Sequence, residues 1–150
     1  MYLYFHNDRM DGMRTLWIAL FLGWIGVGVS AQDFYQQEIT DDIFARIEGK
    51  SFKANCTTLR EDLRYLRVLH YNKDREILEG ELICHKDIAD DLLAIFQELY
   101  KAAYPIERMV LIDEYDADDE ASMRANNTSA FNFRYASGMK RLSSHSTGMA

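Results

Sequence analysis

The end of the chain carries the residues whose types and spacing most clearly suggest chemistry. Ser143, His145, Gly148 and Ala150 stand in the segment LSSHSTGMA. A neutral imidazole is the commonest protein ligand of a metal ion, so His145 is a candidate ligand. The alternative is a mobile tail histidine, because termini are often poorly ordered. A Ser–His nucleophile using Ser143 or Ser144 is weaker, since sequence neighbours do not by themselves bring together a nucleophile, a base and an orienting group.

A second candidate for chemistry lies a few residues earlier, in NNTSAFNFR, residues 126–134. The alternation of residue types predicts a strand with Phe131 and Phe133 on one face and Asn132 and Arg134 on the other. An amide and a guanidinium would then lie together on the polar face. A guanidinium can stabilise a developing negative charge, and it can equally be an ordinary salt-bridge arginine.

Acidic residues crowd the segment DEYDADDE, residues 113–120, which suggests calcium binding. A calcium loop of the EF-hand type beginning at Asp116 would need glycine at its sixth position and glutamate at its twelfth. Ala121 and Asn127 occupy those positions. The pattern therefore excludes an EF-hand, and we expect an acidic loop exposed to solvent.

The first 31 residues have the layout of a secretory signal peptide. Arg14 precedes an apolar run of about 14 residues that begins at Leu16, and small residues follow. We expect cleavage after Ala31, which leaves a domain of residues 32–150. The run is shorter than the roughly 20 residues of a membrane-spanning helix, so we expect no stable membrane span after cleavage. An uncleaved N-terminal anchor is the alternative. Translation starts at one of three methionines: Met1, Met10 or Met13.

Export would place the two cysteines, Cys56 and Cys84, in an oxidising compartment, where they can pair as a disulfide. Two buried free thiols are the alternative. A zinc site formed by both cysteines and His85 lacks the CxxC spacing that makes such sites recognisable, so we set it aside.

Two helices are expected among the elements that must position these residues. The first covers residues 41–48, with Thr40 as its N-cap and Gly49 as its stop. The second begins at Lys86, where apolar residues recur at spacings of three and four. It ends at Pro105, the only proline in the chain. The apolar stripe of this long helix is a core-facing surface.

Strands are expected on either side of the long helix. LRYLRVLHY (63–71) and ILEGELIC (77–84) flank the turn NKDRE and predict an antiparallel hairpin. RMVLIDEY (108–115) is rich in β-forming residues and is expected as a central strand. A further strand is expected over 126–134, and LSSHSTGMA would enter the next one.

The overall composition is that of an ordinary globular protein. The chain has 150 residues, of which 48% are hydrophobic and 27% charged. The formal net charge of −7 argues against a nucleic-acid-binding protein, because that class carries basic surfaces that neutralise phosphates. We therefore expect one domain with an acidic surface and no nucleic-acid partner.

The spacing of Ser143, His145, Gly148 and Ala150 matches the first eight positions of SxHxxGxAxD. This pattern is the zinc signature of the M15 metallopeptidases, the D-alanyl-D-alanine carboxypeptidases and related cell-wall peptidases. LRYLRVLHY, GELICHKDIADDLLAIFQELYKAAYPIERM and NNTSAFNFR also resemble the upstream half of secreted bacterial members. The resemblance implies an α+β fold of the hedgehog and DD-carboxypeptidase type, an antiparallel sheet with packed helices. The M15-like domain of residues 32–150 would be incomplete at its C-terminus.

Members of this family hold zinc by a histidine, an aspartate and a second histidine, and a glutamate acts on the bound water. By the resemblance, His145 is the first zinc ligand. Arg134 would stabilise the oxyanion, with Arg124 as a rival for that role. Ser143 would support His145 by a hydrogen bond or by turn geometry. Gly148 would permit close backbone packing beside the metal.

The remaining zinc ligands and the glutamate of this pattern would follow Ala150. The resemblance implies an exported hydrolase, in the periplasm or outside the cell, that cleaves peptidoglycan stem peptides as a DD- or LD-carboxypeptidase. The present chain would be an inactive fragment, because one ligand cannot hold zinc usefully. The alternatives are a non-catalytic module that binds cell-wall peptides, and an exported interaction protein whose ending only mimics the motif.

Overall fold

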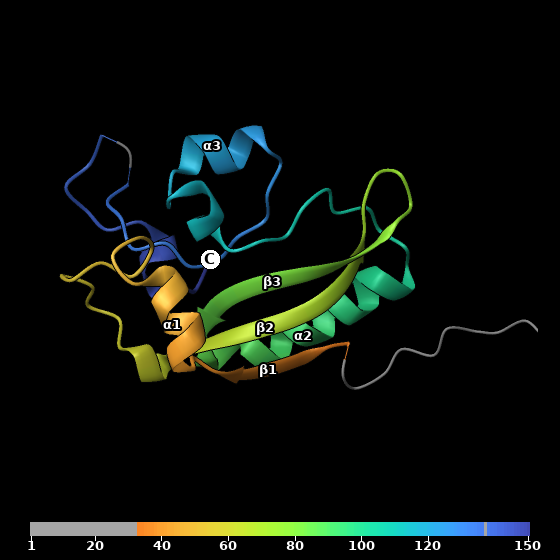
Figure 1. Cartoon of the computed structure of the whole chain (residues 1–150), viewed down its shortest axis with the longest axis horizontal. Helices are drawn as coiled ribbons and strands as arrows, with labels where there is room; N and C mark the ends of the chain where they lie inside the picture. The colour runs from red at the N-terminus through yellow and green to blue at the C-terminus, as the bar shows by residue number, and fades with distance from the viewer. Residues whose placement is uncertain (1–32, 137) are drawn as a thin grey trace, which may run out of the picture.

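The structure is a computed structural model that describes residues 33–136 and 138–150. The predicted signal peptide, residues 1–31, lies outside the described residues. The described part has the predicted α+β class: a three-stranded antiparallel sheet in the order β1-β2-β3, with helices packed on it (Figure 1). The strands and α-helices are β1 (Tyr35–Glu38), α1 (Asp41–Ile47), β2 (Leu63–Tyr71), β3 (Ile77–His85), α2 (Lys86–Lys101) and α3 (Asp119–Arg124).

The predicted hairpin is confirmed as β2 and β3, which pair from Leu63 opposite His85 to the turn. The turn is closed by Asn72, whose backbone N–H donates to the carbonyl of Glu76 (3.0 Å) and whose side-chain oxygen accepts from the Glu76 N–H (2.9 Å). Asparagine favours turns because its side chain can bond nearby backbone in this way. The hairpin is therefore determined by local sequence.

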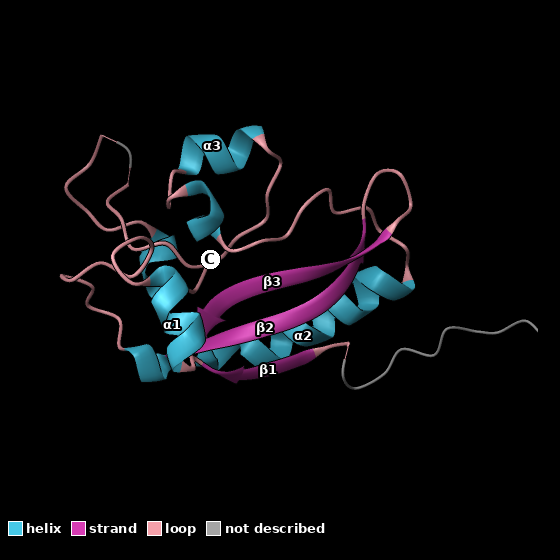
Figure 2. Cartoon of the chain, viewed as in Figure 1, coloured by secondary structure: helices cyan, strands magenta, loops and turns pink. Residues whose placement is uncertain are grey.

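Both predicted helices are confirmed. Helix α1 begins after Thr40, whose hydroxyl oxygen accepts from the N–H of Ile43 (3.4 Å), and Gly49 follows it with a φ of 77°. Helix α2 ends at Lys101, before Pro105. Figure 2 shows α2 running behind the strands, where its apolar stripe packs against the sheet.

The predicted central strand over residues 108–115 is wrong. One backbone hydrogen bond joins this segment to β3, from Glu81 N–H to the carbonyl of Met109 (2.9 Å), and residues 112–115 form a 3-10 helix. The Asn127 side chain pairs with both backbone groups of Val110, accepting from its N–H (2.9 Å) and donating to its carbonyl (3.0 Å). An amide side chain thus takes the place of a neighbouring strand.

The predicted strands over 126–134 and 142–150 are also wrong. The first is irregular chain with an isolated bridge between Arg108 and Asn127, and the second contains a 3-10 helix over Ser144–Thr147. Two elements were not expected from the sequence: strand β1, and helix α3, which begins at the last two residues of the expected acidic loop.

Two clusters of buried side chains form the core. The first lies between α2 and the sheet and includes Leu66, Val68 and Phe96. The second joins α1 to the end of the hairpin and includes Phe131 and Phe133. Among the helices of residues 33–136 and 138–150, none combines the length and apolar character needed to cross a membrane.

Candidate functional site

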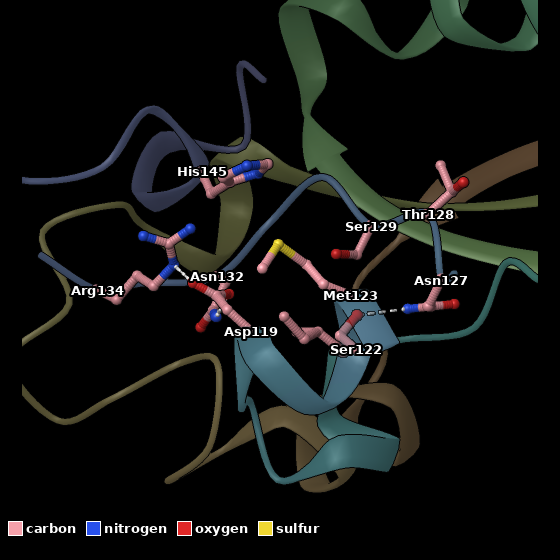
Figure 3. Close-up of a pocket in the computed structure, with 10 residues that line it drawn as sticks. Asp119, Ser122, Met123, Asn127, Thr128, Ser129, Asn132, Arg134 and His145 are labelled. Carbon is pink, nitrogen blue, oxygen red and sulfur yellow. Dashed lines mark hydrogen bonds and ion pairs between the residues drawn. The ribbon is translucent and has the colours of Figure 1, made fainter. Parts of the chain in front are cut away.

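A cavity of about 210 Å³ lies between α3, the irregular segment before Arg134 and the terminal 3-10 helix. Figure 3 shows that His145, Arg134 and Asn132, three residues singled out in the sequence, share this cavity. The cavity is also lined by Ile112, Asp119, Ser122, Met123, Asn127, Thr128 and Ser129. The predicted metal ligand and the predicted oxyanion arginine therefore face one space, although the elements that carry them differ from those expected.

The ring of His145 is held by the backbone. Its Nδ1 lies 2.8 Å from the carbonyl oxygen of Ala130. Because a carbonyl only accepts, this contact assigns a proton to Nδ1, and in the neutral ring the lone pair is then on Nε2. Metal-binding histidines commonly donate the other ring N–H in this way, which fixes the tautomer and the ring orientation. His145 is thus suited to act as a ligand or a base through Nε2.

Arg134 forms an ion pair with Asp119, a residue of α3 that the sequence analysis left in the acidic loop (Figure 3). The contact joins Arg134 Nε to Asp119 Oδ2, and Nε finds no acceptor in hydrogen-bonding geometry within the described chain. Both side chains are partly buried, at 27% and 29% exposure. Asp119 therefore holds the guanidinium at the cavity through Nε and does not contact its terminal nitrogens in the ion pair.

Asn132 orients this ion pair through hydrogen bonds from its side-chain amide. Its Nδ2 donates to Asp119 Oδ1 (2.9 Å) and to the carbonyl of Ala117 (3.2 Å). Because both partners are acceptors, they fix which way the amide points. The predicted alternation of faces holds without a strand: Asn132 and Arg134 both contact Asp119, whereas Phe131 and Phe133 lie in the core.

Asp119 is the main residue that the sequence analysis missed. It lies in the first turn of α3, after the N-cap Asp118, whose carboxylate accepts from the N–H of Ala121 (3.0 Å). Acidic residues after an N-cap favour a helix start, because they interact well with the helix dipole. That signal was present in the sequence, but the density of acids suggested a loop.

Ser143 supports His145 through turn geometry. Its hydroxyl oxygen accepts from the backbone N–H of His145 (3.4 Å) and caps the 3-10 helix, so it contacts the main chain of the histidine. The role of Ser143 in supporting a zinc ligand stays a prediction. Arg124 is exposed at the end of α3 and does not line the cavity, so the geometry favours Arg134 over Arg124.

Gly148 is required for close backbone packing, but at a different place from the one expected. It has a φ of 70°, and a Cβ there would lie 2.8 Å from His85 N and 3.1 Å from Cys84 C. Its carbonyl accepts from His85 N–H (2.9 Å). Gly148 therefore attaches the terminal segment to the end of β3, and it does not line the cavity.

Cys56 and Cys84 are free thiols in the structure, which is the alternative to the possible disulfide. Cys84 lies in the cluster under α2, whereas Cys56 packs against the cluster under α1. Burial raises the pKa of Cys84 to about 12 and also raises the pKa of Cys56. Both thiols are thereby made less reactive.

The donor set of the cavity fits zinc only in part. A zinc ion with an open catalytic position uses three protein ligands, and the imidazole of His145 is a suitable one. Residues 33–136 and 138–150 contain no group of three or more His, Cys, Asp or Glu side chains arranged to hold a metal. The described residues therefore supply one oriented ligand and not a complete metal centre.

No protein-family model, curated protein or solved structure matches the chain. The features that bear on function are the geometry of the cavity and the spacing of the residues that form it. Those residues are His145, its backbone partner Ala130, and the Arg134–Asp119 pair.

Proposed function

We propose that the chain carries part of the site of an exported zinc peptidase of the M15 type, which hydrolyses peptidoglycan stem peptides. The observation that supports this best is the fixed ring of His145, whose Nε2 is left free in a cavity shared with Arg134. A histidine held this way in a mobile tail would be unusual. The family of the chain and its compartment remain part of the proposal.

In this proposal His145 supplies the first zinc ligand of the M15 pattern. His145 would be the described residue that holds the zinc ion, and a bound zinc would supply Lewis-acid chemistry to a peptide carbonyl and to a water molecule. Arg134 contributes guanidinium N–H groups toward the developing negative charge on the substrate oxygen. Asp119 holds the arginine side chain at the cavity until that charge develops.

The second candidate is a module that binds cell-wall peptides without cutting them. One observation favours it: the described chain presents a single histidine, and no metal cluster, to a cavity rich in polar groups. Hydroxyls, an amide and a guanidinium can bind a peptide backbone without any metal. The peptidase would cleave the bound peptide, whereas the binding module would release it intact.

The test is to produce the protein from the full reading frame of its gene and supply a peptide that ends in D-alanyl-D-alanine. Zinc-dependent release of D-alanine, abolished in His145→Ala, is the expected result. His85→Asn is the matched control, since it removes a histidine outside the cavity and asparagine can also serve as an N-cap in its place. Binding without cleavage would favour the module, and neither binding nor cleavage would contradict both.

A further inference from the structure

Ser146 is fully buried and follows His145 in the terminal 3-10 helix. Its hydroxyl oxygen accepts a hydrogen bond from the backbone N–H of Arg134 (3.0 Å) and donates one to the carbonyl of Arg134 (2.6 Å). One side chain therefore pairs with both main-chain groups of the arginine. The side chain of Asn127 likewise pairs with both main-chain groups of Val110. In both segments a side chain therefore makes the hydrogen bonds that a neighbouring strand would make.

Two further hydrogen bonds connect the segments that Ser146 joins. The N–H of Asn132 donates to the carbonyl of His145 (2.9 Å), and the N–H of Ser143 donates to the carbonyl of Arg134 (3.0 Å). Hydrogen bonds thus connect residues 132–134 with residues 143–146. The hydroxyl of Ser146 is the only side-chain group in these hydrogen bonds, so substitution can remove it without changing the others directly.

The backbone of Ser146 has a separate contact on another segment. The hydroxyl of Thr58 donates to the carbonyl of Ser146 (2.9 Å). This bond also holds the terminal segment, but it does not involve Arg134. Thr58 therefore provides a matched control for loss of a hydroxyl that contacts the same residue.

We infer that Ser146 is a positioning residue, which sets the place of Arg134 relative to His145 across the cavity. The inference deepens the proposed function and rests on it for its catalytic meaning. Without the hydroxyl, the N–H of Arg134 loses its partner inside the protein, and a buried unpaired donor is relieved by movement of the chain or by entry of water. A misplacement of about 1 Å at a catalytic group costs on the order of a hundredfold in rate.

The test reads the positions of the two side chains directly and needs neither zinc nor substrate. The full chain is labelled with nitrogen-15 in histidine and arginine, and NMR spectra record the ring nitrogens of His145 and the Nε–H of Arg134. Wild type is expected to show His145 protonated at Nδ1. Ser146→Ala is expected to shift the Arg134 signal and to change the His145 ring signals. Thr58→Ala should leave both at their wild-type positions, and Ser146→Thr should restore them because it keeps a hydroxyl.

Wild-type signals in Ser146→Ala, together with a loss of stability, would overturn the inference and leave Ser146 with a structural role alone. Equal changes in Thr58→Ala would overturn it as well, because they would indicate general loosening of the terminal segment. If Ser146→Ala fails to fold, Ser146→Thr decides: wild-type signals support the inference and displaced signals contradict it. Peptide hydrolysis is measured separately, so failure of the proposed function is distinguishable from failure of this inference.

Discussion

Asp119 and Arg134 form an ion pair at the cavity although one belongs to α3 and the other to an irregular segment. Asn132 joins the pair by donating to the free oxygen of the same carboxylate (2.9 Å). The carboxylate thereby links two segments that the sheet does not connect. The contact uses only Nε of the guanidinium, so Asp119 positions the arginine through one of its donor groups.

Replacing Asp119 by asparagine should cost little stability. The Asp119–Arg134 pair is partly exposed, at 29% and 27%, and such pairs contribute about 1 kcal/mol or less to the free energy of unfolding. Urea denaturation of Asp119→Asn measures the loss. Glu98→Gln is the control, since its pair with Lys101 is more exposed and should contribute even less. A loss of about 3 kcal/mol or more would mean that the ion pair behaves as a buried one.

Gly148→Ala should destabilise the protein more than Gly49→Ala. Both glycines have positive φ, 70° and 77°, and a left-handed conformation costs an alanine about 1–2 kcal/mol. A Cβ at Gly49 meets nothing within 4 Å, whereas at Gly148 it meets the backbone of His85 at 2.8 Å. Overpacking of this kind adds about 1–3 kcal/mol. Equal losses in thermal unfolding would show that the terminal segment does not pack on β3 as described.

The two cysteines should differ in reactivity. In native protein without reductant, Cys56 should react with a thiol reagent slowly, and Cys84 should react only after unfolding, because burial raises its pKa to about 12. Raising the pH from about 7 to about 9 should accelerate the reaction of Cys56 alone. Counting the labelled thiols by mass spectrometry is the measurement. Unfolded protein that releases thiols only after reduction would instead demonstrate a disulfide.

The carboxylate of Glu81 should make stability depend on pH. It accepts two hydrogen bonds from Arg46 (2.8 and 2.7 Å) and one from the hydroxyl of Tyr65 (2.5 Å). The bonds from Arg46, opposed by partial burial, hold the pKa of Glu81 below its usual value of 4.5. Because the folded-state pKa is depressed, the stabilisation is present above pH 4.5 and is lost as the pH falls through the lower value.

The variant that tests this is Glu81→Gln, which keeps the size of the side chain and removes its charge. At pH 7 it should unfold at a lower urea concentration than wild type. The difference should shrink as the pH falls below the usual pKa of 4.5. A difference that stays constant down to about pH 3 would show that the carboxylate charge is not the cause.

Elements that depend on neighbouring residues were predictable from the sequence. The cap at Thr40, the turn at Asn72 and the periodicity of α2 each involve contacts within a few positions, so the predicted elements formed there. The predictions of strands over residues 108–115 and 126–134 were wrong because β propensity indicates that a residue suits a buried sheet surface, and it does not show that the segment pairs with another strand. The side chain of Asn127 makes the hydrogen bonds with the Val110 backbone that a neighbouring strand would otherwise make. This contact is not indicated by any local sequence pattern.

The site was predictable only in its parts. His145 and Arg134 were named from the signature spacing and from the alternation before it, and the structure places both at one cavity. Asp119 was not found, because its role depends on α3 folding back over the segment that carries Arg134 (Figure 3). Ser146 was not found either, because its contacts with Arg134 are long-range.

If His145 presents a free Nε2 as a metal ligand at the cavity it shares with Arg134, zinc binding should depend on this residue. Zinc content is the most direct test, measured by elemental analysis on protein made from the full reading frame and dialysed against zinc. Wild type and His85→Asn should each bind one zinc ion per chain, and His145→Ala should bind none. Zinc that remains bound in His145→Ala, or a wild-type protein that binds none, would contradict it.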